Sequence, residues 1–160
     1  VNALQLTRAV SVIANKGVNR QQSLIKSITD KDGKPVDMLN RSATRVLDEK
    51  IADQIKNAME SALEEYKNVA GVNGYRVAVK SGTAEVVGSD GKLSSIIADF
   101  AGIIPANDPR FVVTVVMQDP DGSYGGTTSG KLFAKIGEFL MQKYDVPNSP
   151  ARTDAIPVEW

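Results

Sequence analysis

The sequence predicts an α+β fold in which an antiparallel sheet is covered by helices. Two helical segments come first, a run of β-branched residues divided by turn signals follows, and a last amphipathic segment closes the pattern. Because helices and strands occur in separate runs instead of alternating, the strands are expected to pair antiparallel. With 160 residues and 42% hydrophobic content, the chain can bury one ordinary core.

Two amphipathic helices are expected before the strands. The first covers about residues 3–16, with Asn2 as its N-cap and Gly17 at the left-handed position that ends it. The second begins after Asp48. Its apolar residues recur at helical spacing beside a charged face: Ile51, Ala52, Ile55, Ala58, Met59, Ala62 and Leu63.

A small surface hairpin is expected between these helices. Residues 22–29 alternate weakly between apolar and polar side chains, and residues 34–38 would form the partner strand. The intervening Asp30-Lys31-Asp32-Gly33 is a turn signal. This segment and Asp119-Pro120-Asp121-Gly122 could suggest calcium loops, but both lack the full ligand set, so turns are the preferred interpretation.

Three consecutive antiparallel strands are expected next, over residues 77–87, 94–104 and 110–118. Turn signals at residues 89–92 and 105–109 separate them.

The last helix is predicted over residues 129–144, with an apolar face that would pack on the sheet. Residues 147–160, which contain three prolines, would form a C-terminal tail behind a single unit spanning residues 1–146.

The composition excludes several classes of function. Nineteen basic and nineteen acidic residues leave no net charge, so nucleic acid is not an expected partner. Without histidine or cysteine, the usual zinc sites and the Ser-His-Asp and Cys-His forms of catalysis are impossible. Acyl transfer would therefore have to use lysine. No apolar stretch approaches the roughly 20 residues that span a bilayer.

One motif carries candidate chemistry: residues 80–84, Lys-Ser-Gly-Thr-Ala, here called the lysine motif. A lysine ammonium orients protons and carboxylates, and the hydroxyls of Ser81 and Thr83 can donate to a substrate carboxylate. Gly82 would let a substrate backbone approach the strand. Taken alone, such a triplet occurs by chance in about one in ten chains of this length, and an ordinary exposed strand lysine is the simpler alternative.

The surrounding segments resemble the class B penicillin-binding proteins, from Val1 to about Val146. The resemblance lies in the opening helix with Ile13-Ala14-Asn15-Lys16-Gly17, in residues 74–84, in residues 98–102 and 109–113, and in Tyr124-Gly125-Gly126. It implies a partial domain of the penicillin-binding/serine β-lactamase-like transpeptidase fold. The implied activity is peptidoglycan D,D-transpeptidation through a serine acyl-enzyme that β-lactams also acylate.

The resemblance assigns the residues of the site and implies no metal or organic cofactor. Catalytic roles fall on Lys80, Ser81, Gly82 and Thr83. The Thr83 backbone N–H would serve as an oxyanion donor. Contacts with stem peptides or β-lactams fall on Ser81, Thr83, Ala84, Tyr124, Gly125 and Gly126.

The resemblance also implies missing parts. In the family, a Ser-x-x-Lys nucleophile motif and a Ser-x-Asn motif precede the helix that opens this chain. Ser23-Leu24-Ile25-Lys26 and Tyr66-Lys67-Asn68 mimic these motifs at the wrong places, and Tyr66 is expected on a solvated helix face. We therefore expect an inactive fragment whose partner is an N-terminal half of the same protein. That half would also anchor it at the extracytoplasmic face of a bacterial membrane.

Two alternatives remain open at this point. A serine β-lactamase or β-lactam sensor shares the lysine motif and the fold. A non-catalytic domain could retain only the scaffold.

Overall fold

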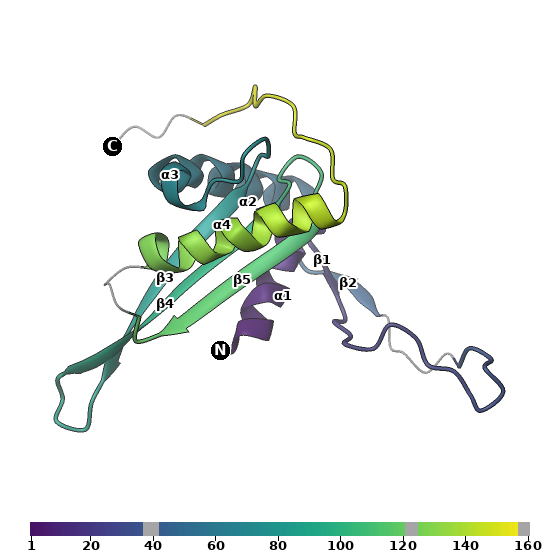
Figure 1. Ribbon diagram of the computed structural model, residues 1–160, viewed down its shortest axis with the longest axis horizontal. Coiled ribbons are helices and arrows are strands. Elements are labelled where there is room, and N and C mark those ends of the chain that lie inside the picture. The colour runs from purple at the N-terminus through teal and green to yellow at the C-terminus, as the bar shows by residue number, and fades with distance from the viewer. Residues whose placement is uncertain (37–41, 121–124, 157–160) are drawn as a thin grey trace.

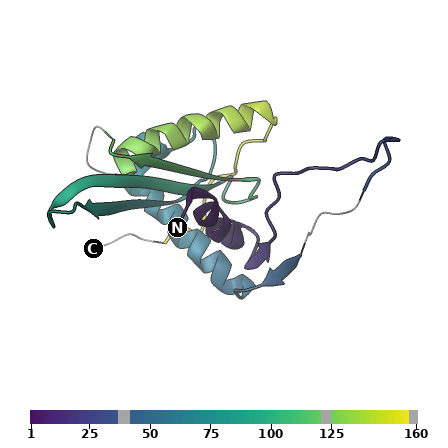
Figure 2. The ribbon, with the colours of Figure 1, turned by 90° about the horizontal axis from the view of Figure 1, so that it is seen from below.

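The centre of the computed structural model is a three-stranded antiparallel sheet with helices on both faces (Figures 1 and 2). Residues 1–36, 42–120 and 125–156 are described. In chain order the elements are α1 (Ala3–Ala14), β1 (Val18–Arg20), β2 (Ala43–Arg45), α2 (Glu49–Ala62), the 3-10 helix η1 (Leu63–Tyr66), α3 (Lys67–Ala70), β3 (Ala78–Val87), β4 (Leu93–Ile104), β5 (Phe111–Gln118) and α4 (Gly125–Lys143).

The sheet has the order β3-β4-β5, which confirms the prediction of three consecutive antiparallel strands. The pairing of β3 with β4 runs from Ala78 opposite Ile103 to Val87 opposite Leu93. Each strand begins within one residue of its expected start. Within the described residues, β3 is an edge strand of this sheet.

Helix α4 covers one face of the sheet, as Figure 2 shows. Its Phe133 is fully buried, and the ring centroid lies 5.1 Å from that of Phe100 on β4. Gly102 makes this approach possible, since a Cβ there would lie 2.5 Å from the Cζ atom of Phe133. The helix begins four residues earlier than predicted, at Gly125.

Helices α1 and α2 cover the opposite face. Their buried residues Val10 and Met59 form a second apolar cluster with residues of β3 and β4. The expected caps are confirmed: the Asn2 side chain accepts from the backbone N–H of Gln5, and Asp48 accepts from that of Lys50. Within the part of the chain that the structure describes, no helix has both the length and the apolar character to cross a bilayer.

The predicted hairpin between the two helices is wrong in its strands. Residues 22–29 are irregular apart from a single bridge between Thr29 and Pro35, and residues 37 and 38 lie outside the described part. Leu24 is 95% exposed, so the weak alternation has no core face to bury. Instead, β1 pairs with β2 at the base of the segment (Figure 1). The expected turn is present, since Asp30 accepts from two backbone N–H groups beyond it.

The described part of the predicted tail, residues 147–156, packs against the body of the protein. The backbone N–H of Arg76 donates to the Ser149 hydroxyl at 3.0 Å. Arg76 also holds the buried Glu60 carboxylate through two hydrogen bonds of 2.6 and 2.9 Å, and it reaches Asp154 at 3.0 Å. This charge network holds Asp154, in the described part of the tail, beside the start of β3.

The buried ring of Phe133 is expected to dominate the stability that α4 contributes. Replacing Phe133 by alanine should lower the free energy of unfolding by about 3–5 kcal/mol, because a cavity would remain between α4 and β4. The measurement is urea denaturation of the protein. Phe139→Ala is the matched control, because Phe139 lies on the same helix but is 57% exposed. Among the described residues, the ring interaction recorded for Phe139 is with the Lys143 ammonium. Phe139→Ala should cost less than about 1 kcal/mol, and equal losses for the two variants would contradict this packing.

Candidate active-site strand

The lysine motif occupies the middle of β3 (Ala78–Val87). Side chains alternate along a strand, so Lys80 and Gly82 share one face while Ser81 and Thr83 share the other. The register places Ser81 opposite Phe100 and Thr83 opposite Ala98. The half-buried Ser81 and the exposed Thr83 thus lie on an edge strand that is paired on one side with β4.

Lys80 is exposed at this strand, and its ammonium group donates to the backbone carbonyl of Ser81. The strand opposite presents an acidic partner, because Gly82 pairs with Asp99 of β4. A Cβ at residue 82 would lie 2.5 Å from the Oδ1 atom of Asp99. Glycine at residue 82 therefore leaves space for the Asp99 carboxylate directly against β3.

Asp99 is a charged neighbour that the sequence analysis missed. Burial raises the pKa of Asp99, and the nearby Lys80 ammonium opposes part of that rise. Since the turn at residues 89–92 was predicted, counting residues outward from it along both strands would have brought residue 99 close to the motif.

Tyr66 is a second neighbour of the motif, and here the prediction of a solvated face is wrong. Its hydroxyl lies 3.0 Å from the Ser81 Oγ atom. Its ring packs edge-on against Phe100, with centroids 5.7 Å apart. Lys67 and Asn68, the other two residues of the mimicking triplet, are exposed as expected.

The start of α4 lies close to the Thr83 end of the motif. The buried Ser129 hydroxyl donates to the carbonyl of Ala98 at 3.2 Å, and Ala98 is the partner of Thr83. Gly125 and Gly126 are the first two residues of this helix. Tyr124, grouped with them in the sequence, lies outside the described residues. Ala84, the last residue of the motif, is exposed.

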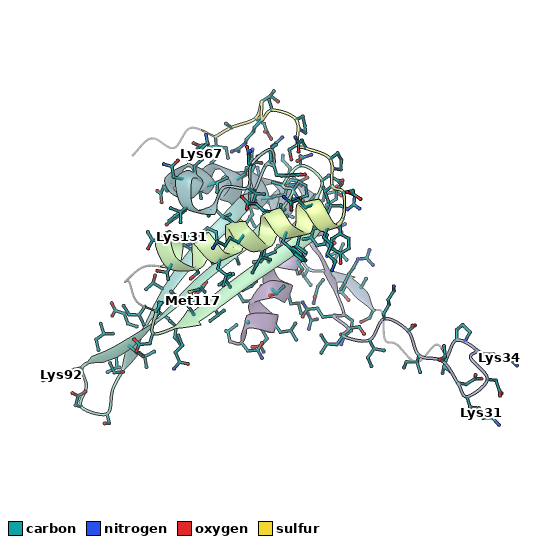
Figure 3. The ribbon with its side chains drawn as sticks, in the orientation of Figure 1. Lys31, Lys34, Lys67, Lys92, Met117 and Lys131 are labelled. Atoms are coloured by element: carbon teal, nitrogen blue, oxygen red, sulfur yellow. The ribbon has the colours of Figure 1, made fainter. Side chains whose placement is uncertain are left out.

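The segment that mimics the nucleophile motif lies apart from this site. Ser23 is exposed, and its hydroxyl makes local bonds with the backbone of Ile25. Figure 3 labels Lys31 and Lys34 at the tip of the same segment, at the opposite end of the molecule from Lys92 in the β3–β4 turn. In residues 1–36, 42–120 and 125–156, no three Asp or Glu side chains gather in a way that could hold a metal ion.

The hydroxyls of Ser81 and Thr83 share one face of an edge strand, and hydroxyl donors of this kind can bind a carboxylate. Sheet-borne strands of this composition occur in enzymes that transfer acyl groups with lysine assistance. Residues 1–138 match the family described as penicillin binding protein transpeptidase domain. The chain therefore belongs to this family.

Individual relatives agree with that assignment. The chain is 38% identical over 141 residues to the peptidoglycan D,D-transpeptidase FtsI of Escherichia coli (strain K12), covering 85% of this chain and 22% of that protein. A crystal structure of a peptidoglycan synthetase from Bifidobacterium adolescentis matches at 60% identity with a TM-score of 0.91, over 100% of this chain and 30% of the other. Penicillin binding protein 3 from Mycobacterium tuberculosis, complexed with ampicillin, matches at 29% identity with a TM-score of 0.83, over 96% and 37%.

These matches confirm the predicted fold, a mixed helical and antiparallel-sheet transpeptidase domain that is present in part. The chain spans about a quarter of the length of the curated relatives, from 22% to 25% for the first three.

The positive charge of Lys80 is expected to affect the pKa of Asp99. In the Lys80→Met variant the pKa of Asp99 is expected to rise further, because the cation that favours the ionised carboxylate is gone. The measurement is the carboxyl 13C chemical shift of Asp99 followed against pH. Lys92→Met, in the turn of the same hairpin, is the control and should leave the midpoint in place. A midpoint that falls in Lys80→Met would contradict this arrangement.

The raised pKa of Asp99 determines how its contribution to stability changes with pH. The folded pKa of Asp99 lies above the unfolded one, so the folded state binds the proton more tightly. The contribution of Asp99 to stability should therefore increase as the pH falls from the folded to the unfolded pKa. In Asp99→Asn this part of the pH dependence should be absent from denaturation curves.

Proposed function

We propose that this chain is the C-terminal half of the catalytic domain of a peptidoglycan D,D-transpeptidase. One observation carries the proposal: Lys80, Ser81 and Thr83 lie on an accessible edge strand within a domain that belongs to the transpeptidase family. The D,D-transpeptidase name of a relative that is 38% identical supports the reaction class.

The motif residues have distinct roles in this reaction. The hydroxyls of Ser81 and Thr83 bind the terminal carboxylate of a stem peptide, and charge-assisted bonds of this kind are the stronger class of hydrogen bond. Lys80 sets the electrostatics and the proton network of the nucleophile. The Thr83 N–H faces the oxyanion that develops when the acyl group is attacked. Further contacts with the substrate are assigned to Ala84, Gly125 and Gly126, and to Tyr124, which lies outside the described residues.

The nucleophile belongs to the other half of the domain. We propose an N-terminal half carrying Ser-x-x-Lys and Ser-x-Asn motifs, which completes the cleft and anchors the protein at the extracytoplasmic face of the bacterial membrane. The chain without that half is inactive, since removing a nucleophile removes the covalent step.

β-Lactams are the second class of ligand. They present an anionic carboxylate or sulfonate next to a reactive carbonyl, and such an anion can accept hydrogen bonds from the hydroxyls of the motif. Ampicillin and aztreonam complexes of the Mycobacterium tuberculosis relative support this assignment.

Labelling of the full-length protein with fluorescent penicillin tests the function. A stable covalent adduct is expected on denaturing gels. Lys80→Ala should slow its formation by about 100-fold or more, the scale on which positioned proton-transfer groups contribute. Lys92→Ala, in the exposed turn of the same hairpin, is the matched control and should label at the wild-type rate.

Each other outcome identifies a different protein. Labelling followed by rapid loss of the adduct would indicate a serine β-lactamase, and a stable adduct without transpeptidation of stem peptides would indicate a sensor. No adduct at all would indicate a scaffold without catalysis.

A further inference from the structure

The contact between Tyr66 and Ser81 joins the motif to a residue that no part of the proposed reaction uses. Their hydroxyl oxygens lie 3.0 Å apart, a normal hydrogen-bond distance, and either group could donate. Each hydroxyl carries one proton and can accept further bonds. The direction of this hydrogen bond therefore decides where the Ser81 proton points.

A bound carboxylate fixes that direction. An ionised carboxylate accepts hydrogen bonds but has none to donate, so Ser81 must give its single proton to the ligand. The bond to Tyr66 then survives only with the tyrosine as donor. We propose that Tyr66 is a positioning residue: its hydroxyl donates to the Ser81 Oγ atom and so directs the Ser81 proton toward the carboxylate of the stem peptide or β-lactam.

The packing around Tyr66 suits a fixed donor. Its ring is partly buried and meets Phe100 edge-on, while Phe100 is fully buried and pairs with Ser81 across the β3–β4 ladder. The tyrosine ring and the serine are thus held by the same residue. A donor that is already in place loses little freedom when the ligand binds.

The hydrogen bond from Tyr66 also strengthens the hydrogen bond that Ser81 donates to the ligand. A hydroxyl that accepts a hydrogen bond becomes a better donor, and chains of such bonds reinforce one another. Tyr66 would therefore raise affinity for the carboxylate without touching the ligand. Because this inference rests on the proposed function, its test must separate the two.

The test compares two forms of one antibiotic on the full-length protein. Tyr66→Phe removes the hydroxyl and keeps the ring against Phe100. Acylation by benzylpenicillin, which carries the free carboxylate, is expected to slow by about three- to tenfold, the usual value of one hydrogen bond. Acylation by benzylpenicillin methyl ester should slow by a smaller factor, because the neutral ester carbonyl accepts a weaker hydrogen bond than an ionised carboxylate does. The ratio of the two rates is unaffected by the fraction of protein that folds.

Two further variants control the result. Tyr75→Phe removes a similar half-buried hydroxyl, which donates to the carbonyl of Val146 at 2.6 Å, and should leave the acid-to-ester ratio unchanged. In Ser81→Ala the Tyr66 hydroxyl has lost its target, so adding Tyr66→Phe should have little further effect on acylation by the acid.

The outcomes separate the two proposals. If the wild-type protein forms no adduct, the transpeptidase proposal fails and this inference fails with it. If the wild type is acylated but Tyr66→Phe slows acid and ester equally, or adds its full effect to Ser81→Ala, Tyr66 is merely structural and only the inference is overturned.

Discussion

The antiparallel register between β3 and β4 determines which side chains surround the lysine motif. It places Phe100 opposite Ser81 and Asp99 opposite Gly82, so one partner strand supplies both the apolar support and the acidic neighbour of the motif. A slip of one residue would exchange these faces and put the carboxylate against the α4 core. The interlocked pair of Phe133 and Gly102 disfavours such a slip, because the ring fits only above a residue without a side chain.

Long periodic segments made most of this fold predictable. The apolar stripes of α1, α2 and α4 and the β-branched runs of the sheet each bury one face, and burial is what produces the pattern. The segment between α1 and α2 lacks that relationship. Its β1 and β2 are three residues each, and Ala43–Arg45 is exposed throughout, so their pairing leaves no apolar alternation in the sequence. The alternation at residues 22–29 was therefore misleading.

The sequence predicted the motif residues on β3 but not the side chains from other elements that surround them. The motif is contiguous, and the segments around it resemble those of a known family. Lys80 to Thr83 could therefore be placed on a strand from the sequence. Tyr66 reaches Ser81 only because α2 gives way to the 3-10 turn η1 (Leu63–Tyr66). Four residues at three per turn rotate the last side chain by about 80° relative to a continued α-helix. No pattern in the sequence indicates the change from α-helix to 3-10 helix, and a continued α-helix was expected to expose Tyr66 to solvent.

Two ring contacts connect the apolar core to Ser81 of the lysine motif. Phe133 touches Phe100, Phe100 touches Tyr66, and the Tyr66 hydroxyl touches Ser81. A substitution at residue 133, on the far side of the sheet from α1, can thus disturb a hydroxyl that it never contacts. A change in ligand binding caused by such a substitution would not identify residue 133 as a ligand contact. Variants in this row of rings should be compared by their free energy of unfolding before a loss of binding is assigned to the motif itself.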